Sequence, residues 1–303
     1  MTDLVPEEVR RLADRRQAAR DAKDFEAADA LRGRIRDLGF VVTDTAAGPS
    51  LDPAGTEAPN EPPPERVRPD QIVSLLDRAP DADASMHWIV EGWPEDVRRG
   101  IASFRRHAAD LSVQHVVVDV TADGGEWPEA DDLVLLRPGT GWADARNAGL
   151  VRSSGRVVAV VDGSVEALGD ALAPLISALA DPGVGVTGPF GIVTEELHHF
   201  NESEGPEVDA IEAYLMAFRR ELLEGGLRFD RKFRFYRTAD IELSFQVKNM
   251  GLRALVTPVP VERHEHRMWA STPEDRREQL SKRNFYRFLD RWRGRSDLTV
   301  AGG

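Results

Sequence analysis

From residue 71 onward, short apolar runs alternate with segments of helical period, and this alternation limits the chain to a few fold classes. The apolar runs predict strands over 87–90, 113–118, 133–136 and 156–161. Helices are predicted between them, over 94–107 and 142–152. This order is typical of a largely parallel sheet with helices on both faces, so we expect an α/β fold.

Two of the predicted strands end in an aspartate. Asp119 follows the run 113–118, and Asp162 follows the run 156–161. Ligands of parallel sheets bind beyond the carboxyl ends of the strands. Each aspartate can be a polar strand end or a ligand contact, and this position favours the ligand contact.

Asp240 precedes a predicted helix that has Leu243, Val247 and Met250 on one side and ends at Gly251. An N-cap aspartate and a catalytic base both fit this position. The helix N-terminus lowers the pKa of a nearby carboxyl group, which weakens it as a base. Burial has to oppose that shift if Asp240 is to accept a proton.

The rest of the second half is predicted from apolar spacing. A stripe over 208–222, followed by Gly225 and Gly226, predicts a helix. The run 254–261 predicts an edge strand, because Pro258 and Pro260 interrupt it.

Three further features are open to two interpretations each. His264–Glu265–His266 follows the last strand and fits either a metal or phosphate site or a plain polar loop. Arg146 follows Gly139 and Gly141, which fit a ligand-binding turn or a simple one. The basic face at 282–295 fits a solvated helix surface or a contact with phosphate or anionic lipid. The polar segment 195–205 is expected to be a mobile loop over the site.

The first 70 residues have a different composition. Residues 1–45 predict a helical hairpin, with Asp24 as a cap and Gly39 as the end of the second helix. Seven of residues 46–70 are proline, which predicts an extended linker. We therefore expect three parts: a hairpin at 1–45, a flexible linker at 46–70 and the α/β domain at 71–303.

Composition excludes several classes of protein. The absence of cysteine excludes disulfides, thiolate metal sites and a cysteine nucleophile. The sequence contains no run of eighteen apolar residues, the length that a membrane span needs, and no evident signal sequence. The expected location is therefore the cytoplasm, with peripheral membrane contact as an alternative. A net charge of −13 disfavours a general nucleic-acid binder.

Several stretches together resemble the inverting glycosyltransferases of family 2, which have the GT-A fold. They are 91–104, 116–125, 141–150 (GWADARNAGL), 157–165 (VVAVVDGSV), 235–266 and 281–292. Their order along the chain is the specific part of the resemblance. It implies a nucleotide-diphosphate sugar as donor and a hydroxyl acceptor of unknown identity.

The resemblance also implies roles for individual residues. Asp240 matches the general base that takes the proton of the acceptor hydroxyl. Asp162 and His264 match the ligands of Mg²⁺ or Mn²⁺, and Asp119 matches the contact to the nucleotide base. Arg146 matches a contact to the nucleotide or its phosphates. Glu91 and Ser164 complete the nucleotide-sugar site that the resemblance implies.

The chain departs from the family pattern at three positions. Ser164 replaces the second metal-binding acid, Val120 replaces an acid of the nucleotide loop, and Ala239 replaces the acid before the base. A hydroxyl is a weaker ligand for Mg²⁺ than a carboxylate, so Arg263 or Arg267 is expected to help stabilise the diphosphate. The alternative function is a nucleotide-sugar-binding module that has lost turnover.

Residues 16–48 resemble a different family, the C-terminal helical tail of cysteinyl-tRNA synthetase. The resemblance lies in RQAARDAKDFEAADALRGRIRDLGFVVTDTAAG. It implies contact with tRNA through residues 1–45. A hairpin used for docking to a protein or for dimerisation is the alternative, which the neutral charge of this segment favours.

Overall fold

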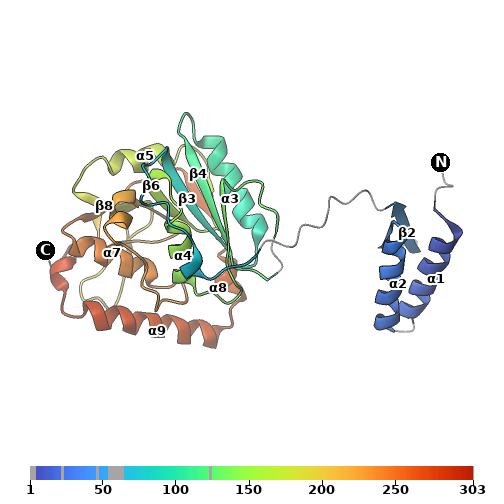
Figure 1. The fold of residues 1–303 in the computed structure, drawn as a ribbon. Coiled ribbons are helices and arrows are strands. Elements are labelled where there is room, and N and C mark those ends of the chain that lie inside the picture. The colour runs from blue at the N-terminus through green and yellow to red at the C-terminus, as the bar shows by residue number, and fades with distance from the viewer. Residues whose placement is uncertain (1–4, 22–23, 46–47, 54–64, 123–124, 303) are drawn as a thin grey trace. The chain divides into compact units, whose positions relative to one another are not determined.

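The computed structural model of the chain describes residues 5–21, 24–45, 48–53, 65–122 and 125–302 (Figure 1). The chain divides into two compact units, Met1–Pro64 and Glu65–Gly303. The second unit begins before the predicted boundary at residue 70, because Arg66 and Val67 pack on the sheet. Arg66 Nη1 donates to the carbonyls of Asp119 (3.1 Å) and Leu136 (3.0 Å), and Val67 forms a bridge with Leu136.

The first unit is a pair of helices followed by a strand hairpin. Its elements are α1 (Glu7–Asp21), α2 (Phe25–Asp37), β1 (Phe40–Thr45) and β2 (Gly48–Pro53), and the two strands are antiparallel. Asp24 caps α2 as expected, since its carboxylate accepts the Ala27 N–H at 3.1 Å. Gly39, with φ +81°, provides the left-handed turn after α2.

A small apolar core holds these elements together. It consists of Val9, Leu12, Ala13, Leu31, Ile35 and Val42. Leu38, the C-cap residue of α2, is 42% exposed. The strand β2 occupies part of the segment expected as a linker. Residues 46–47 and 54–64 of that segment, with the three consecutive prolines, lie outside the described residues.

The second unit is built on one large sheet, with strands in the order β11–β14–β8–β13–β6–β3–β4–β5. The strands β3, β4, β5 and β6 are mutually parallel, as are β8 and β14, whereas β13 and β11 run antiparallel to their neighbours. The bounds are β3 (Ala82–Val90), β4 (Val113–Asp119), β5 (Asp132–Leu135), β6 (Gly155–Val161), β8 (Val184–Gly188), β11 (Glu207–Val208), β13 (Leu215–Arg219) and β14 (Arg253–Val256). The predicted α/β class with a mostly parallel sheet is confirmed.

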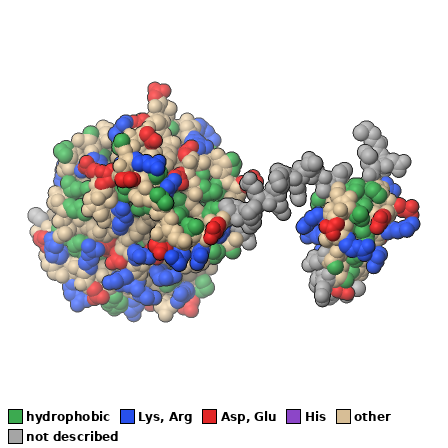
Figure 2. Space-filling model, in the orientation of Figure 1, with side chains coloured by type: hydrophobic (Ala, Val, Ile, Leu, Met, Phe, Trp, Pro, Cys, Tyr) green, Lys and Arg blue, Asp and Glu red, His purple; other side chains and the backbone are tan. Residues whose placement is uncertain are grey.

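Helices cover both faces of this sheet (Figure 1). One face packs on α3 (Pro94–His107) and α5 (Leu172–Ala178), around Trp88, Ile101 and Phe104. The other face packs on α4 (Trp142–Leu150), α6 (Arg220–Glu224), α7 (Ala239–Asn249) and α9 (Glu274–Trp292). Figure 2 shows Lys and Arg side chains gathered where α9 lies, on the basic outer face that the sequence predicts.

Short elements complete the second unit. They are the 3₁₀ turns η1 (Pro69–Gln71) and η2 (Ser296–Leu298), the strands β7 (Val165–Ala167), β9 (Gly191–Val193), β10 (Asn201–Ser203), β12 (Ala210–Ile211) and β15 (Val261–Arg263), and the helix α8 (Arg267–Ser271). Strand β9 pairs with β10 and β12, and β15 pairs with β7. In the described part of the chain, no helix is long and apolar enough to cross a bilayer.

The predicted helix over 208–222 is wrong. This segment forms β11, β12 and β13, and only its last residues enter a helix, α6. Val208, Ile211, Leu215 and Phe218 are fully buried, and so are Met216 and Ala217 between them. A strand buried on both faces carries an unbroken apolar run, which also contains the spacing of a helix.

The predicted edge strand over 254–261 is also different in the structure. It is divided into β14, which lies inside the sheet between β11 and β8, and β15, which pairs with β7. Pro258 and Pro260 fall in the gap between them, where no ladder hydrogen bond is needed. The chain passes from the large sheet to the β7–β15 pair at these prolines, and His266, shortly after β15, lies beside Asp162.

Candidate active site

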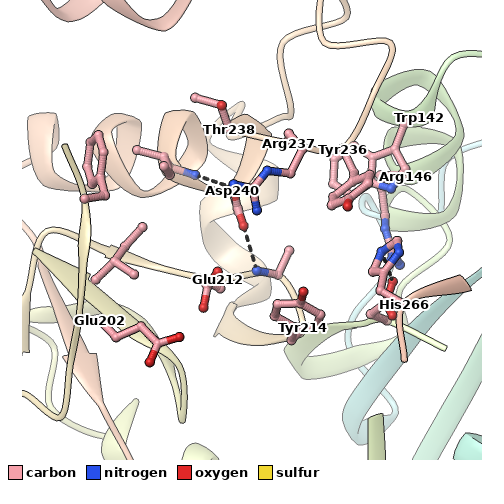
Figure 3. A pocket seen from close by; sticks show the side chains of 15 residues that line it. Trp142, Arg146, Glu202, Glu212, Tyr214, Tyr236, Arg237, Thr238, Asp240 and His266 are labelled. Atoms are coloured by element: carbon pink, nitrogen blue, oxygen red, sulfur yellow. Dashed lines mark hydrogen bonds and ion pairs between the residues drawn. The ribbon is translucent and has the colours of Figure 1, made fainter. Parts of the chain in front are cut away.

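A cavity of about 290 Å³ opens at the carboxyl end of β6, where the parallel strands end (Figure 3). Its walls come from α4, the residue after β6, the strands β9 and β10, the turn before β13, the start of α7 and the residue before α8. They are Trp142, Arg146, Asp162, Ile192, Phe200, Glu202, Glu212, Ala213, Tyr214, Tyr236, Arg237, Thr238, Asp240, Ile241 and His266. Asp162 and Asp240, both predicted from the sequence, therefore face one cavity.

Asp162 is the centre of a small network at one end of the cavity. Its Oδ1 accepts the N–H of Ser164 at 2.9 Å and the Ser164 hydroxyl, and its Oδ2 lies 3.3 Å from Nε2 of His266. Burial acts to raise the pKa of Asp162, but the contacts with His266 and Ser164 outweigh it and hold the pKa at about 2. Asp162 is therefore a carboxylate at neutral pH.

His266 is held in place by Asp162 and by an aromatic ring. Its imidazole stacks on Tyr236, with 4.4 Å between ring centroids. Burial acts to lower the pKa of His266, but the carboxylates of Asp162 and Glu91 outweigh it and raise the pKa above its ordinary value. His266 therefore carries positive charge at a higher pH than an ordinary histidine.

His264, predicted as the metal-binding histidine, does not reach Asp162. Its Nε2 lies 2.9 Å from Oε2 of Glu166 on β7. The two histidines are separated by one residue after β15, and only His266 lines the cavity. The partner of Asp162 is thus His266, and the prediction for His264 is wrong in its geometry.

Arg146 lies under the cavity and ties two strands together. Its Nη1 donates to the carbonyl of His87 (2.8 Å) and its Nη2 to the carbonyl of Val161 (2.9 Å). The residue is only 3% exposed, and burial lowers its pKa to about 10, against the opposing effects of Asp162 and Glu91. The guanidinium also lies over the ring of Trp142, 5.3 Å from the centroid. This arginine positions the strand ends as well as lining the cavity.

Glu91 and Ser164 line a smaller cavity of about 40 Å³, which also contains Asp162 and His266. The two cavities therefore meet at the Asp162–His266 pair. Burial raises the pKa of Glu91 to about 7, and the nearby Arg146 opposes the shift. The hydroxyl of Ser164 donates to Asp162, so this serine orients the carboxylate.

Asp119 does not reach either cavity. Its carboxylate is 1% exposed and accepts the N–H (2.8 Å) and hydroxyl (2.7 Å) of Thr121 and the indole N–H of Trp127 (3.3 Å). Arg66 adds an ion-pair contact at 3.6 Å. The strand end is at the expected edge, but the side chain is turned inward and holds the following loop.

Asp240 is in the first turn of α7, and Thr238 is the N-cap residue of that helix. The Asp240 Oδ2 accepts the N–H of Ala213 at 3.1 Å, and Oδ1 accepts the N–H of Ile241 at 2.9 Å. Burial raises the pKa of Asp240, and these backbone hydrogen bonds and Arg237 oppose the shift. Because Thr238 is the N-cap, the interpretation of Asp240 as the cap is wrong. The raised pKa makes the Asp240 carboxylate a stronger base.

Glu212 is a site residue that the sequence did not indicate. Burial and the charge of Asp240 raise its pKa to about 7, and Arg263, whose Nη1 is 3.9 Å from Oε2, opposes the shift. Because residues 208–222 were expected to form a helix, Glu212 itself was not singled out. Tyr214, Tyr236 and Arg237 also line the cavity and were missed. Tyr214 lies in the segment expected to be a helix, and Tyr236 and Arg237 lie within 235–266, where Asp240, Arg263 and the histidines were singled out instead.

The donor set of Asp162 and His266 fits part of a cation site. Within the described residues there is no cluster of three or more His, Asp or Glu that could hold a metal. Ligand oxygens of Mg²⁺ lie about 2.1 Å from the ion, so adjacent ligands are about 3 Å apart. That spacing is close to the 3.3 Å between Nε2 of His266 and Oδ2 of Asp162. The N–H of Trp269 donates to Nδ1 of His266 at 3.2 Å, so Nε2 carries the proton of this contact and would have to release it to bind a cation. A diphosphate and water would supply the other ligands, and the imidazole favours Mn²⁺ over Mg²⁺.

The fold of the chain is similar to that of solved glycosyltransferases. A crystal structure of GalNAc-T7 with UDP, GalNAc and Mn²⁺ superposes with a TM-score of 0.56 at 14% identity, covering 71% of this chain and 49% of that one. This is the GT-A fold. A mannosyltransferase from Pyrobaculum calidifontis in complex with GDP-Man and Mn²⁺ superposes with a TM-score of 0.49 at 20% identity, covering 73% of this chain and 67% of that one.

The first unit matches a different family. Residues 2–48 match the model of the cysteinyl-tRNA ligase anticodon binding domain. Cysteine–tRNA ligases of Methanosarcina acetivorans and Opitutus terrae are 46% and 52% identical over 50 residues, 16% of this chain. That stretch is 11% of the length of each of these two relatives. The likeness is therefore to one small domain of these ligases.

Proposed function

We propose that the chain transfers a sugar from a nucleotide-diphosphate donor to a hydroxyl acceptor with inversion at the anomeric carbon, and that Asp240 is the base. One observation carries the proposal: Asp240 faces the same cavity as the Asp162–His266 pair. Asp240 would be the proton acceptor, and the diphosphate would bind at the Asp162–His266 end of the same cavity. The GT-A fold of the unit supports it.

The reaction needs one proton transfer and one displacement. The acceptor hydroxyl loses its proton to the Asp240 carboxylate while its oxygen forms a bond to the anomeric carbon. The bond from that carbon to the diphosphate oxygen breaks on the opposite face, and its electron pair stays on the diphosphate. Attack opposite the leaving group inverts the anomeric centre.

The departing diphosphate gains negative charge, which the site has to stabilise. A bound Mn²⁺ or Mg²⁺ would neutralise part of that charge, and Asp162 and His266 are the residues that would hold it. Arg267 is occupied by ion pairs with Glu95 and with Asp96, the latter at 3.2 Å. Arg263 lies 3.9 Å from the carboxyl group of Glu212. Both arginines therefore contact acidic side chains and are not free to take the place of the metal ion.

The experiment is a donor screen with the full chain. UDP- and GDP-sugars are tested with and without Mn²⁺ for a shift in melting temperature and for release of nucleoside diphosphate. We expect at least one donor to stabilise the protein and to be hydrolysed slowly. If no nucleotide or nucleotide sugar shifts the melting temperature, the proposal is wrong. Binding without any turnover favours the module that has lost catalysis, which the replacements at Ser164 and Ala239 motivate.

A second function is supported by the match of residues 2–48 to an anticodon-binding domain. We propose that this unit contacts tRNA or a protein. Filter binding of the full chain to tRNA at physiological salt tests the first partner. Binding that disappears with modest salt would be non-specific electrostatic attraction and would favour the protein partner.

A further inference from the structure

A second, larger cavity of about 790 Å³ adjoins the active-site cavity. Glu202 and Glu212 line both, so the two spaces meet at these side chains. The remaining lining of the second cavity consists of Pro189, Phe190, Gly191, Ser203, Glu204, Val256, Pro258, Val259 and Arg263. The function proposed above does not yet use this space.

The second cavity lies on the base side of the active site. Figure 3 shows Glu202 and His266 toward opposite ends, with Asp240 and Glu212 between them. The N–H of Ala213, next to Glu212, donates to Asp240. A molecule in the second cavity therefore reaches Asp240 past Glu212, away from the Asp162–His266 end where the diphosphate belongs.

Arg263 is held between rings at the junction. Its guanidinium carbon lies 4.7 Å from the ring centroid of Tyr214 and 5.2 Å from that of Phe190. Its Nη1 is 3.9 Å from Oε2 of Glu212. The arginine offers hydrogen-bond donors to a molecule in the cavity, and its one positive charge is outnumbered by Glu202 and Glu204 in the same lining.

Glu202 and Glu204 give the second cavity an acidic wall. Both are exposed, and within the described residues neither takes part in an ion pair or in a side-chain hydrogen bond. Carboxylates accept hydrogen bonds from hydroxyl groups and repel phosphate or carboxylate groups. Phe190, Pro258 and Val259 supply apolar surface of the kind that packs on the C–H face of a sugar ring.

We propose that the second cavity binds the acceptor, and that the acceptor is an uncharged polyhydroxylated molecule with the chemistry of a glycoside or oligosaccharide. The inference rests on the proposed function, because it needs Asp240 to be the base. The inference excludes acceptors that carry phosphate or carboxylate groups next to the reacting hydroxyl.

The test is binding of the full-length Asp240→Asn protein to an array of immobilised neutral, phosphorylated, sialylated and amino glycans. Each sample contains Mn²⁺ and either UDP or GDP, whichever of the two stabilises the protein. We expect binding to neutral glycans, weakened at least tenfold by Glu202→Lys with Glu204→Lys. The matched control is Glu274→Lys with Glu278→Lys, on the exposed part of α9, which changes the net charge equally and is expected to leave binding unchanged.

Three results overturn the inference: binding only to charged glycans, no glycan binding, or equal loss in the control and the double variant. Nucleotide binding is measured in the same samples by the shift in melting temperature. A protein that binds nucleotide but no neutral glycan contradicts the acceptor inference alone. A protein that binds no nucleotide contradicts the proposed function.

Discussion

Nε2 of His266 lies 3.3 Å from Oδ2 of Asp162, although the two residues are far apart in the sequence. The pairing of β15 with β7 brings them together, since Arg263 is in register with Val165. This side-chain contact and the backbone hydrogen bond from the His264 N–H to the Ser164 carbonyl (2.8 Å) together join the end of β6 to the C-terminal part of the unit.

The first prediction separates the two histidines. His266→Ala removes a partner of Asp162 and is expected to weaken binding of the nucleoside diphosphate with Mn²⁺ by about tenfold or more. His264→Ala is the matched control, because its imidazole contacts Glu166, and we expect little change. Titration calorimetry measures both. An equal loss in the two variants would contradict the assignment.

Arg146 is expected to affect folding as well as binding. Arg146→Met leaves the carbonyls of His87 and Val161 without their donor inside the protein. We expect the free energy of unfolding to fall by about 2–4 kcal/mol, because unpaired buried acceptors are costly. Urea unfolding measures this, with Arg106→Met on the exposed side of α3 as the control. A stability equal to the control would show that the two hydrogen bonds contribute little.

Glu212 makes stability depend on pH. Its pKa is about 7 in the folded state against an ordinary value of 4.5, so between these values the folded state holds the proton that the unfolded state has lost. Stability due to this group is present below pH 4.5 and is lost as the pH rises through 7. Glu212→Gln is therefore expected to gain about 3 kcal/mol relative to the original protein between pH 4.5 and pH 8. A constant difference across that range, measured by urea unfolding, would contradict the raised pKa.

The two units are expected to be separable between residues 64 and 65. Deleting residues 1–64 is expected to leave the melting temperature of the second unit within about 2 °C of its value in the full chain. Deleting residues 1–70 also removes Arg66 and Val67, with their hydrogen bonds to the sheet, and is expected to lower it by several degrees. Calorimetry distinguishes the two truncations. If both behave alike, residues 65–70 are not part of the folded unit.

Strong periodic patterns predicted the central fold. Val116–Val117–Val118 and Val157–Val161 are valine-rich runs followed by aspartates, and they became the strands β4 and β6 on either side of β3. The segment 208–222 failed because an unbroken buried run fits a helix and a strand equally well. Only its pairing with β6 and β8 decides between them, and that pairing is not local.

The sequence predicted which strand ends form the site, but it did not predict which side chains face the cavity. Asp119 sits at the expected edge and turns inward to Thr121 and Trp127. His264 and His266 both follow β15, and only the path of the chain after that strand decides that His264 contacts Glu166 and His266 contacts Asp162. Glu212 and Arg263 meet through tertiary packing, so no spacing in the sequence could reveal them.

The most direct test of the account is Asp240→Asn in the full chain, measured for sugar transfer and for nucleotide binding. The substitution keeps the size of the side chain and removes the proton acceptor. We expect turnover to fall by about 10²–10⁴-fold, while the affinity for the nucleoside diphosphate with Mn²⁺ stays within a factor of about three. Transfer by this variant at the rate of the original protein would contradict the role of Asp240 as the base.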